Sequence, residues 1–265
     1  MTISEDVILL RISLSDRIIC RAMGPLWKGN SGLIESKVLI SSSFLKSHMP
    51  LLLKRKVDHN SELAVWHATE SMDYFKDKLN LDAEEGKRLS EMMPHRQKEW
   101  LASRYLLHLI SGDKVRRHIS KRTTGKPYRI HCPKNISVSH SREHVACIIS
   151  ESVVGLDIQR KEDKIIRIQH KFISEEEKAH IPEDQAIDYY HVFWGAKESM
   201  YKAYGLKNLD FKKNMHLYPF KLMKGITEFR GYVKTDKIRQ EYKLEVEKID
   251  GAYLVNCIQE QNIII

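Results

Sequence analysis

The sequence predicts an α+β protein in which helices pack on antiparallel β-sheet. Short β-forming runs precede a group of helical segments, a hairpin signal lies in the middle, and a long helix is followed by more strands. Of the 265 residues, 42% are hydrophobic and 30% are charged, which is typical of a soluble globular protein. No apolar run reaches the length of a transmembrane helix, so we expect no membrane span.

The first part of the chain is expected to form strands. Short β-like runs cover Ile3 to Leu14 and Lys37 to Leu45, and a third run, Leu51-Leu-Leu53, ends before the basic residues Lys54-Arg-Lys56. The segment from Leu63 to Thr69 is rich in β-forming residues and predicts a further strand.

Helices are expected next. Ser71 and Asp82 are good N-caps and predict short helices through Leu79 and Ser90. Pro94 suits the first turn of a longer helix. Along one line of that helix, four residues recur at intervals of four: Arg96, Trp100, Arg104 and His108. Such arginines can pack their stems and leave the charge in water, or their planar forks can bind a phosphate.

A turn and a hairpin follow. The segment from Thr123 to Tyr128 contains a glycine and a proline, which predict a turn, and Lys126 in isolation would be a solvated loop residue. From Ile136, apolar residues alternate with serines up to His140, and a second strand begins at Val145, so the segment predicts a hairpin.

The strand predicted from Val153 to Arg160 has two different faces. One face carries Val154, Leu156 and Ile158, and the other carries Gly155, Asp157 and Gln159. The first face suits a core. The second is either an ordinary exposed face or a site, because a carboxylate stands beside a glycine where a backbone or a ligand can approach.

A long helix is expected from about Pro182 to Gly205. A first-turn proline favours its start and the glycine its left-handed stop. Its apolar stripe is Phe193, Ala196, Met200 and Ala203, and a different face carries Trp194, Glu198 and Lys202. Taken alone, Glu198 and Lys202 would be a surface ion pair.

The segments on either side of this helix also carry signals. Before it, Ser174 and Glu177 fit a capping box. After it, strands are predicted at residues 215–220, 226–233, 242–249 and 252–257. Asp250-Gly251, between the last two strands, is a strong hairpin signal.

Four of these motifs, taken in order, resemble the Sfp-type 4′-phosphopantetheinyl transferase family. They stand as Gly125-Lys-Pro127, Ile136-Ser-Val-Ser-His-Ser141, Gly155-Leu-Asp-Ile-Gln159 and Trp194-Gly-Ala-Lys-Glu-Ser-Met-Tyr-Lys202. Upstream, the segment from Arg96 to Arg104 looks like the family's arginine-bearing helix. The resemblance extends from about Trp66 to Gly205.

The resemblance implies a fold of two similar α/β halves with pseudo-twofold symmetry. Coenzyme A would then lie in the cleft between the halves. We place the boundary near Ser152, so that residues 1–152 form an N-terminal half with the coenzyme A nucleotide contacts. Residues 153–265 then form a C-terminal half with the metal site and the catalytic helix.

The activity implied is Mg²⁺-dependent transfer of 4′-phosphopantetheine from coenzyme A to a serine of an apo acyl or peptidyl carrier protein. By resemblance, Asp157 and Glu198 would hold Mg²⁺, and Lys202 would stabilise the phosphate charge. Glu177 or Glu198 would take the serine proton. Glu177 therefore has a capping and a catalytic interpretation, of which capping is favoured.

The coenzyme A contacts are also implied by resemblance. The family's matching arginine contacts the 3′-phosphate, which favours phosphate binding for Arg104, whereas Arg96 is expected to be solvated. Lys126 would lie beside the nucleotide, and Ser139 and His140 would contact phosphate.

Gln159 departs from the family pattern, since many members have a glutamate there. Mg²⁺ binds through one or two carboxylates plus substrate phosphates and keeps several waters. Asp157 and Glu198 would meet this requirement. Gln159 is expected to ligate through its carbonyl oxygen or to hold a metal-bound water, and its loss is expected to raise the Mg²⁺ requirement.

The formal charge of +9 attracts polyanions and leaves an alternative function open. A non-catalytic protein that binds acidic partners or nucleic acid would explain the charge but not the ordered motifs. An unrelated phosphotransferase is disfavoured because no Walker loop or Gly-x-Gly-x-x-Gly motif occurs. The acidic N-terminus and the four scattered cysteines favour the cytoplasm. We expect a monomer with no nucleic-acid or membrane partner.

Overall fold

The computed structural model describes residues 50–206 and 208–264. The predicted strands at Ile3–Leu14 and Lys37–Leu45 lie outside this part of the chain. The first elements are β1 (Leu51–Asp58), β2 (Ser61–His67), α2 (Met72–Leu79), α3 (Ala83–Ser90), α4 (Pro94–Ser111), β3 (Ile119–Lys121), β4 (Pro127–Arg129), β5 (Asn135–Ser141) and β6 (His144–Ser150). The later elements are β7 (Val154–Arg160), α5 (Lys164–Ile168), α6 (Glu175–Lys178), α7 (Ala186–Tyr204), β8 (Met215–Leu217), β9 (Thr227–Lys234), β10 (Ile238–Ile249) and β11 (Ala252–Ile264). This mixture of helices and antiparallel strands confirms the α+β prediction.

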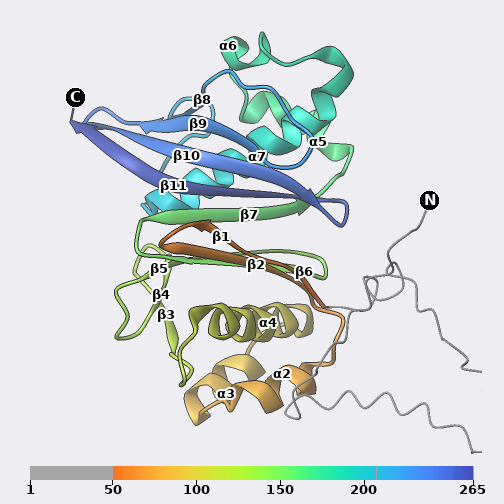
Figure 1. The fold of residues 1–265 in the computed structure, drawn as a ribbon, viewed down its shortest axis with the longest axis vertical. Coiled ribbons are helices and arrows are strands. Elements are labelled where there is room, and N and C mark those ends of the chain that lie inside the picture. Colours follow the sequence, from red (N-terminus) through yellow and green to blue (C-terminus); the bar gives the residue numbers. More distant parts are fainter. Residues whose placement is uncertain (1–49, 207, 265) are drawn as a thin grey trace, which may run out of the picture. The chain divides into compact units, whose positions relative to one another are not determined.

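The described residues are arranged in four layers (Figure 1). Helices α2, α3 and α4 cover one face of a four-stranded antiparallel sheet with the order β1-β2-β6-β5. The other face of this sheet packs on a five-stranded antiparallel sheet with the order β7-β11-β10-β9-β8. Helix α7 covers the far face of the second sheet. Ser152 lies between the last strand of the first sheet and the first strand of the second, and the division into two domains stays a prediction.

Strand β7 is buried on both of its faces. Val154, Leu156 and Ile158 enter the core between the two sheets, as the alternation predicts. The other face lies against α7, where a Cβ atom placed on Gly155 would stand 1.8 Å from the carbonyl oxygen of Ser199. The close approach expected beside this glycine is therefore made by a helix backbone, and the alternative of an exposed strand face is wrong.

The local signals for helix ends and turns are largely confirmed. The side chains of Ser71 and Asp82 accept backbone N–H groups at the starts of α2 and α3. Gly205 ends α7 with a φ of 69°. Asp250 and Gly251 both have positive φ values, as a tight hairpin between β10 and β11 requires. No helix of the described part is long and apolar enough to span a membrane.

The bounds of several elements differ from the sequence prediction. Strand β1 continues through Lys54–Lys56, because Arg55 donates to Glu247 at 2.8 Å and to Glu245 at 2.9 Å on the second sheet. Helix α7 begins at Ala186, after a 3₁₀ turn at Glu183–Gln185, and so later than the start predicted near Pro182. Strands β10 and β11 are longer than predicted, because they pair with each other from Ala252 out to Ile264.

The close packing of β7 on α7 leads to a stability prediction. Gly155→Ala should lower the free energy of unfolding by more than about 3 kcal/mol, because the methyl group meets helix backbone that cannot rotate away. Gly86→Ala is the matched control. Gly86 lies in α3 with open space around its Cα, so alanine there should stabilise by about 0.5–1 kcal/mol. Urea unfolding of both variants tests this, and equal stabilities would contradict the packing.

Candidate functional site

Two other predicted site residues, Ser139 and Lys202, contact Asp157 of β7. Oδ1 of Asp157 accepts a hydrogen bond from Ser139 Oγ on β5 at 2.9 Å and from Lys202 Nζ on α7 at 2.8 Å. Lys202 Nζ also donates to Ser139 Oγ at 3.0 Å and to the Leu156 carbonyl at 2.9 Å. Asp157 is only 7% exposed, so its charge depends on these partners.

Glu198 lies on α7 one turn before Lys202 and adds a second carboxylate to the site. Burial raises the pKa of Glu198 above its usual value, Lys202 opposes the rise, and the negative charge of Asp157 adds to it. A partly buried carboxylate with a second negative charge nearby attracts a cation. Carboxylate oxygens are the hard donors that Mg²⁺ prefers, so the donor set fits this ion.

Gln159 lies two residues after Asp157 on the face of β7 that packs against α7, and its side chain contacts that helix. Its amide nitrogen donates to the His191 carbonyl at 2.9 Å, and its carbonyl oxygen lies 3.1 Å from His191 Nδ1. The amide nitrogen also lies 3.5 Å from Asp157 Oδ2. The part of Gln159 that comes nearest to Asp157 is thus a donor, and its role as a metal ligand stays a prediction.

His191, which contacts Gln159, was not among the site residues predicted from the sequence. It stands seven residues before Glu198, which is two helical turns on the same face of α7. That spacing was the available signal.

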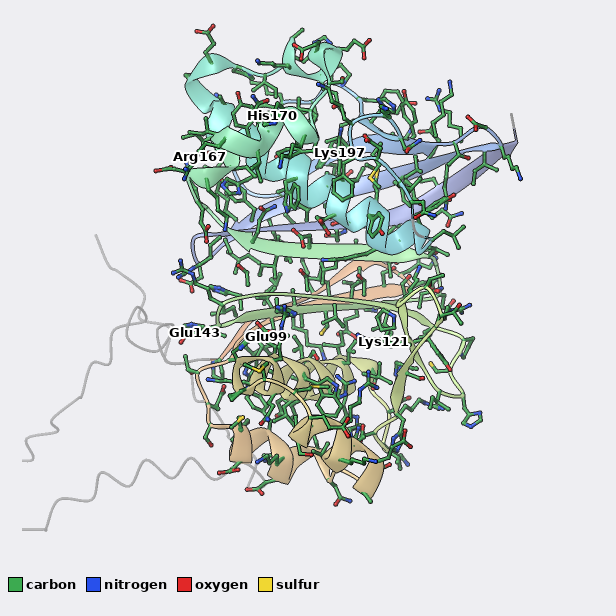
Figure 2. All side chains as sticks on the ribbon, turned by 180° about the vertical axis from the view of Figure 1, so that it is seen from behind. Glu99, Lys121, Glu143, Arg167, His170 and Lys197 are labelled. Atoms are coloured by element: carbon green, nitrogen blue, oxygen red, sulfur yellow. The ribbon has the colours of Figure 1, made fainter. Side chains whose placement is uncertain are left out.

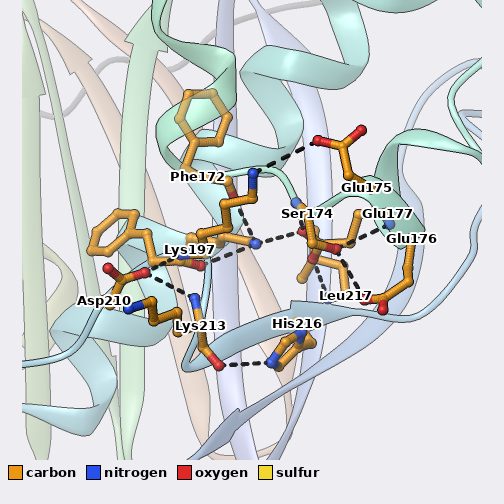
Figure 3. Close-up of polar contacts among 12 residues, drawn as sticks. Phe172, Ser174, Glu175, Glu176, Glu177, Lys197, Asp210, Lys213, His216 and Leu217 are labelled. Carbon is orange, nitrogen blue, oxygen red and sulfur yellow. Dashed lines mark hydrogen bonds and ion pairs between the residues drawn. The ribbon is translucent and has the colours of Figure 1, made fainter.

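Glu177, the other candidate base, lies in a separate buried cluster (Figure 3). Its Oε2 accepts from the Ser174 N–H at 2.9 Å and from Lys197 Nζ at 2.7 Å, and its Oε1 accepts from the Leu217 N–H at 3.0 Å. The capping box with Ser174 is confirmed. Both carboxylate oxygens are engaged by donors, and the general-base role stays a prediction.

Lys197 is fully buried and lies beside this carboxylate (Figure 3). Besides Glu177, its ammonium donates to the carbonyls of Phe172 at 2.6 Å and Phe211 at 3.1 Å. Burial lowers the pKa of Lys197 and the charge of Glu177 opposes the change. The lysine of the helix motif therefore supports the core of the second sheet, whereas Lys202 turns to Asp157.

Arg104 lines a hollow of about 470 Å³ between α4 and the β3–β5 region. Its guanidinium carbon lies 3.4 Å from the centre of the Trp100 ring, and it donates to the Trp100 carbonyl at 3.2 Å. Arg104 is only 7% exposed, and its Nε has no hydrogen-bond partner among the described residues. Burial lowers the pKa of Arg104, and the nearby Arg88 lowers it further. A buried cation with an unsatisfied donor attracts an anion.

His140 lies in the same hollow, between two side chains of α4. Its Nδ1 lies 3.2 Å from Glu99, which Figure 2 shows between α4 and the first sheet, and its Nε2 lies 3.3 Å from Arg96. Arg96, expected to be solvated, therefore contacts a candidate site residue while its side chain is still 57% exposed. Burial lowers the pKa of His140.

A second hollow of about 280 Å³ adjoins the first and reaches Lys202. The two share Gly125, Pro127 and Val138 among their lining residues. Lys126 lines the second hollow, and its ammonium donates to the Ala203 carbonyl at 2.6 Å near the end of α7. Arg104 and His140 therefore line one of two adjoining hollows, and Lys126 and Lys202 line the other.

Comparison with known proteins confirms the resemblance. Residues 153–255 match a sequence model described as the 4′-phosphopantetheinyl transferase superfamily. The match includes the strands after Gly205, where the motifs showed little likeness. It does not include Arg104, Lys126, Ser139 or His140.

Three curated proteins are similar to part of this chain. The 4′-phosphopantetheinyl transferase gsp of Aneurinibacillus migulanus is 30% identical over 110 residues, which is 40% of this chain and 46% of that protein. A 4′-phosphopantetheinyl transferase of Bacillus subtilis is 32% identical over 85 residues, covering 31% of this chain and 38% of that protein. The 4′-phosphopantetheinyl transferase Sfp of Bacillus subtilis strain 168 is 29% identical over 97 residues, covering 35% and 43%. The matches span less than half the length of each relative.

The buried pair of Glu177 and Lys197 leads to a prediction that separates its two interpretations. Glu177→Gln should lower the free energy of unfolding by about 3–5 kcal/mol, because it leaves the ammonium of Lys197 buried without its counter-charge. Glu175→Gln, on the exposed side of α6, should change it by less than about 0.5 kcal/mol. The measurement is urea unfolding. A Glu177→Gln protein of parental stability that lacks activity would instead support the general-base role.

Proposed function

We propose that the protein transfers 4′-phosphopantetheine from coenzyme A to a serine hydroxyl of an apo acyl or peptidyl carrier protein. One observation carries the proposal. Two adjoining hollows, together called the groove, are lined by the buried and partly unsatisfied Arg104 in one and by Lys202, which donates to Asp157, in the other. Such a groove suits an elongated ligand with phosphates at both places, and the family match supports coenzyme A as that ligand.

Each end of the groove would hold a different phosphate of coenzyme A. Arg104 would bind the 3′-phosphate with its free donor, because a guanidinium pairs well with phosphate oxygens. His140 and Lys126 line the walls between, where they would contact the nucleotide. Ser139 and Lys202 would lie at the pyrophosphate, since both already donate to the Asp157 carboxylate.

The reaction forms a bond between the serine oxygen and the phosphorus that carries pantetheine. The bond from this phosphorus to the bridging oxygen breaks, and 3′,5′-adenosine diphosphate leaves with the electron pair. Lys202 would stabilise the charge on the leaving phosphate. Glu198 would take the serine proton, directly or through a water molecule. Glu177 is the other candidate for this role.

Asp157 and Glu198 would hold Mg²⁺ through their carboxylates. The bound ion would neutralise part of the negative charge of the pyrophosphate. Gln159 is the third predicted ligand or the holder of a metal-bound water.

We also propose which partners the protein binds and where in the cell it acts. A monomer in the cytoplasm would act on acidic carriers through its positive surface, with no nucleic-acid or membrane partner. Binding of acidic partners without catalysis is the alternative, and it leaves the groove and the buried Arg104 unexplained.

The activity itself is the first test. Apo-carrier proteins incubated with the protein, coenzyme A and Mg²⁺ should gain the mass of one phosphopantetheine per attachment serine, read by mass spectrometry. EDTA should abolish the gain, because the two carboxylates alone leave the pyrophosphate charge unbalanced. A carrier with that serine changed to alanine is the control. If the folded protein leaves every member of a broad panel of carriers unmodified, the proposed transferase function is wrong.

A second test measures the affinity of an Arg104 variant for coenzyme A and needs no transfer activity. Arg104→Ala should weaken coenzyme A by roughly 1.5–3 kcal/mol, about tenfold or more, because a charged hydrogen bond is lost. Dephospho-coenzyme A should bind the variant and the parent equally well. The matched control is Arg167→Ala, which removes the same charge from the exposed surface of α5 (Figure 2). Equal losses for both ligands in Arg104→Ala would indicate a structural role.

A further inference from the structure

The end of β7 beyond Asp157 is joined to α7 by a reciprocal pair of hydrogen bonds. The Gln159 amide nitrogen donates to the His191 carbonyl at 2.9 Å, and the Gln159 carbonyl oxygen faces His191 Nδ1 at 3.1 Å. Gly195, one turn further along α7, leaves the room for this amide, since a Cβ there would lie 3.0 Å from the Gln159 nitrogen. The side chain of Gln159 is therefore enclosed by the helix.

The direction of these bonds follows from the orientation of the Gln159 amide. Its nitrogen donates to the His191 carbonyl, so its carbonyl oxygen is the atom that faces the ring, and Nδ1 of His191 is the donor to it. Nε2 of His191 lies 3.0 Å from the Glu162 N–H and 3.2 Å from the Glu162 carbonyl oxygen. The ring is 2% exposed and burial lowers its pKa, which is consistent with the neutral form. The carbonyl oxygen that a metal would need is thus already occupied.

The histidine ring is itself held firmly. It stacks on Tyr253 of β11 with the ring centres 5.1 Å apart and the planes 6° from parallel. The Tyr253 hydroxyl donates to Asp188, which also pairs with Lys161 and with Lys248 at 2.6 Å. This network connects β7, β10 and β11 to the first turn of α7.

We propose that Gln159 and His191 are a positioning pair that sets how α7 lies on β7, and so the distance between the carboxylates of Asp157 and Glu198. The proposal rests on the transferase function proposed above. It gives Gln159 a different task from the one that the motif suggests. The amide donates toward Asp157 Oδ2 from 3.5 Å and orients that carboxylate, while the metal is held by Asp157 and Glu198 alone.

The first experiment is a double-mutant cycle on transfer. Gln159→Met keeps the size of the side chain without its polar atoms, and His191→Phe keeps the stack on Tyr253. Each should lower kcat by about tenfold to a hundredfold, the range for residues that orient metal ligands, and the double variant should fall no further. The Mg²⁺ concentration for half-maximal rate should shift by the same factor in all three variants, because the two residues would act on the spacing of the carboxylates as one unit. His191→Asn, which restores a donor to Gln159, should recover most of kcat.

Two outcomes of this experiment would overturn the proposal. If Gln159→Met raises the Mg²⁺ requirement and His191→Phe does not, Gln159 is a ligand as the motif suggests. If the two effects on kcat multiply in the double variant, the residues do not act as a pair. Ser61→Ala is the control for a merely structural loss. It removes a buried hydrogen bond to Ser150 at 2.7 Å in the first sheet, and it should lower stability without changing kcat.

A second measurement needs no activity and so separates this proposal from the function on which it rests. In the metal-free protein, each single variant should lower the urea midpoint of unfolding, and the double variant should match the singles, because the partners lose the same bonds. Additive shifts in the midpoint would contradict the pairing whether or not the protein is a transferase. An inactive parent with non-additive shifts would preserve the pair and remove only the transferase function.

Discussion

The packing of β7 against α7 is the constraint on which the site depends. Gly155 lets the Ser199 backbone approach the strand, and this brings Asp157 opposite the last turns of the helix. Lys202 then reaches Asp157 at 2.8 Å, and Glu198 is close enough for its pKa to respond to both charges. Any side chain larger than hydrogen at position 155 would separate the two elements and, with them, Asp157 and Lys202.

Helix α7 divides its charged residues between structure and site. Lys197 points into the core of the second sheet and neutralises Glu177, whereas Lys202 lines the groove and reaches Asp157 on β7, and Glu198 is near enough to both for its pKa to respond. Adjacent positions of a helix differ by about 100°, so Lys197 and Glu198 of the same motif necessarily serve different surroundings. The motif therefore combines a buried ion pair that stabilises the fold with a polar face that supplies the candidate chemistry.

Much of the local structure could be predicted from the sequence, because caps, glycine stops and alternation act over a few residues. The ends of α2 and α3 and the hairpin at Asp250-Gly251 are examples. The continuation of β1 through its basic run could not, because it depends on carboxylates almost 200 residues away. Likewise, the position of Gln159 beside Asp157 suggested a ligand, and only the packed helix shows that His191 meets its amide.

The central claim is that Asp157 and Glu198 form one metal site at the pyrophosphate of coenzyme A. The most direct test is a crystal structure of the protein with coenzyme A and Mn²⁺, with the ion located by its anomalous scattering. The claim predicts an anomalous peak bonded to the carboxylates of both Asp157 and Glu198 and to the pyrophosphate, with the 3′-phosphate at Arg104. A peak remote from these carboxylates, or coenzyme A outside the groove between Arg104 and Lys202, would contradict it.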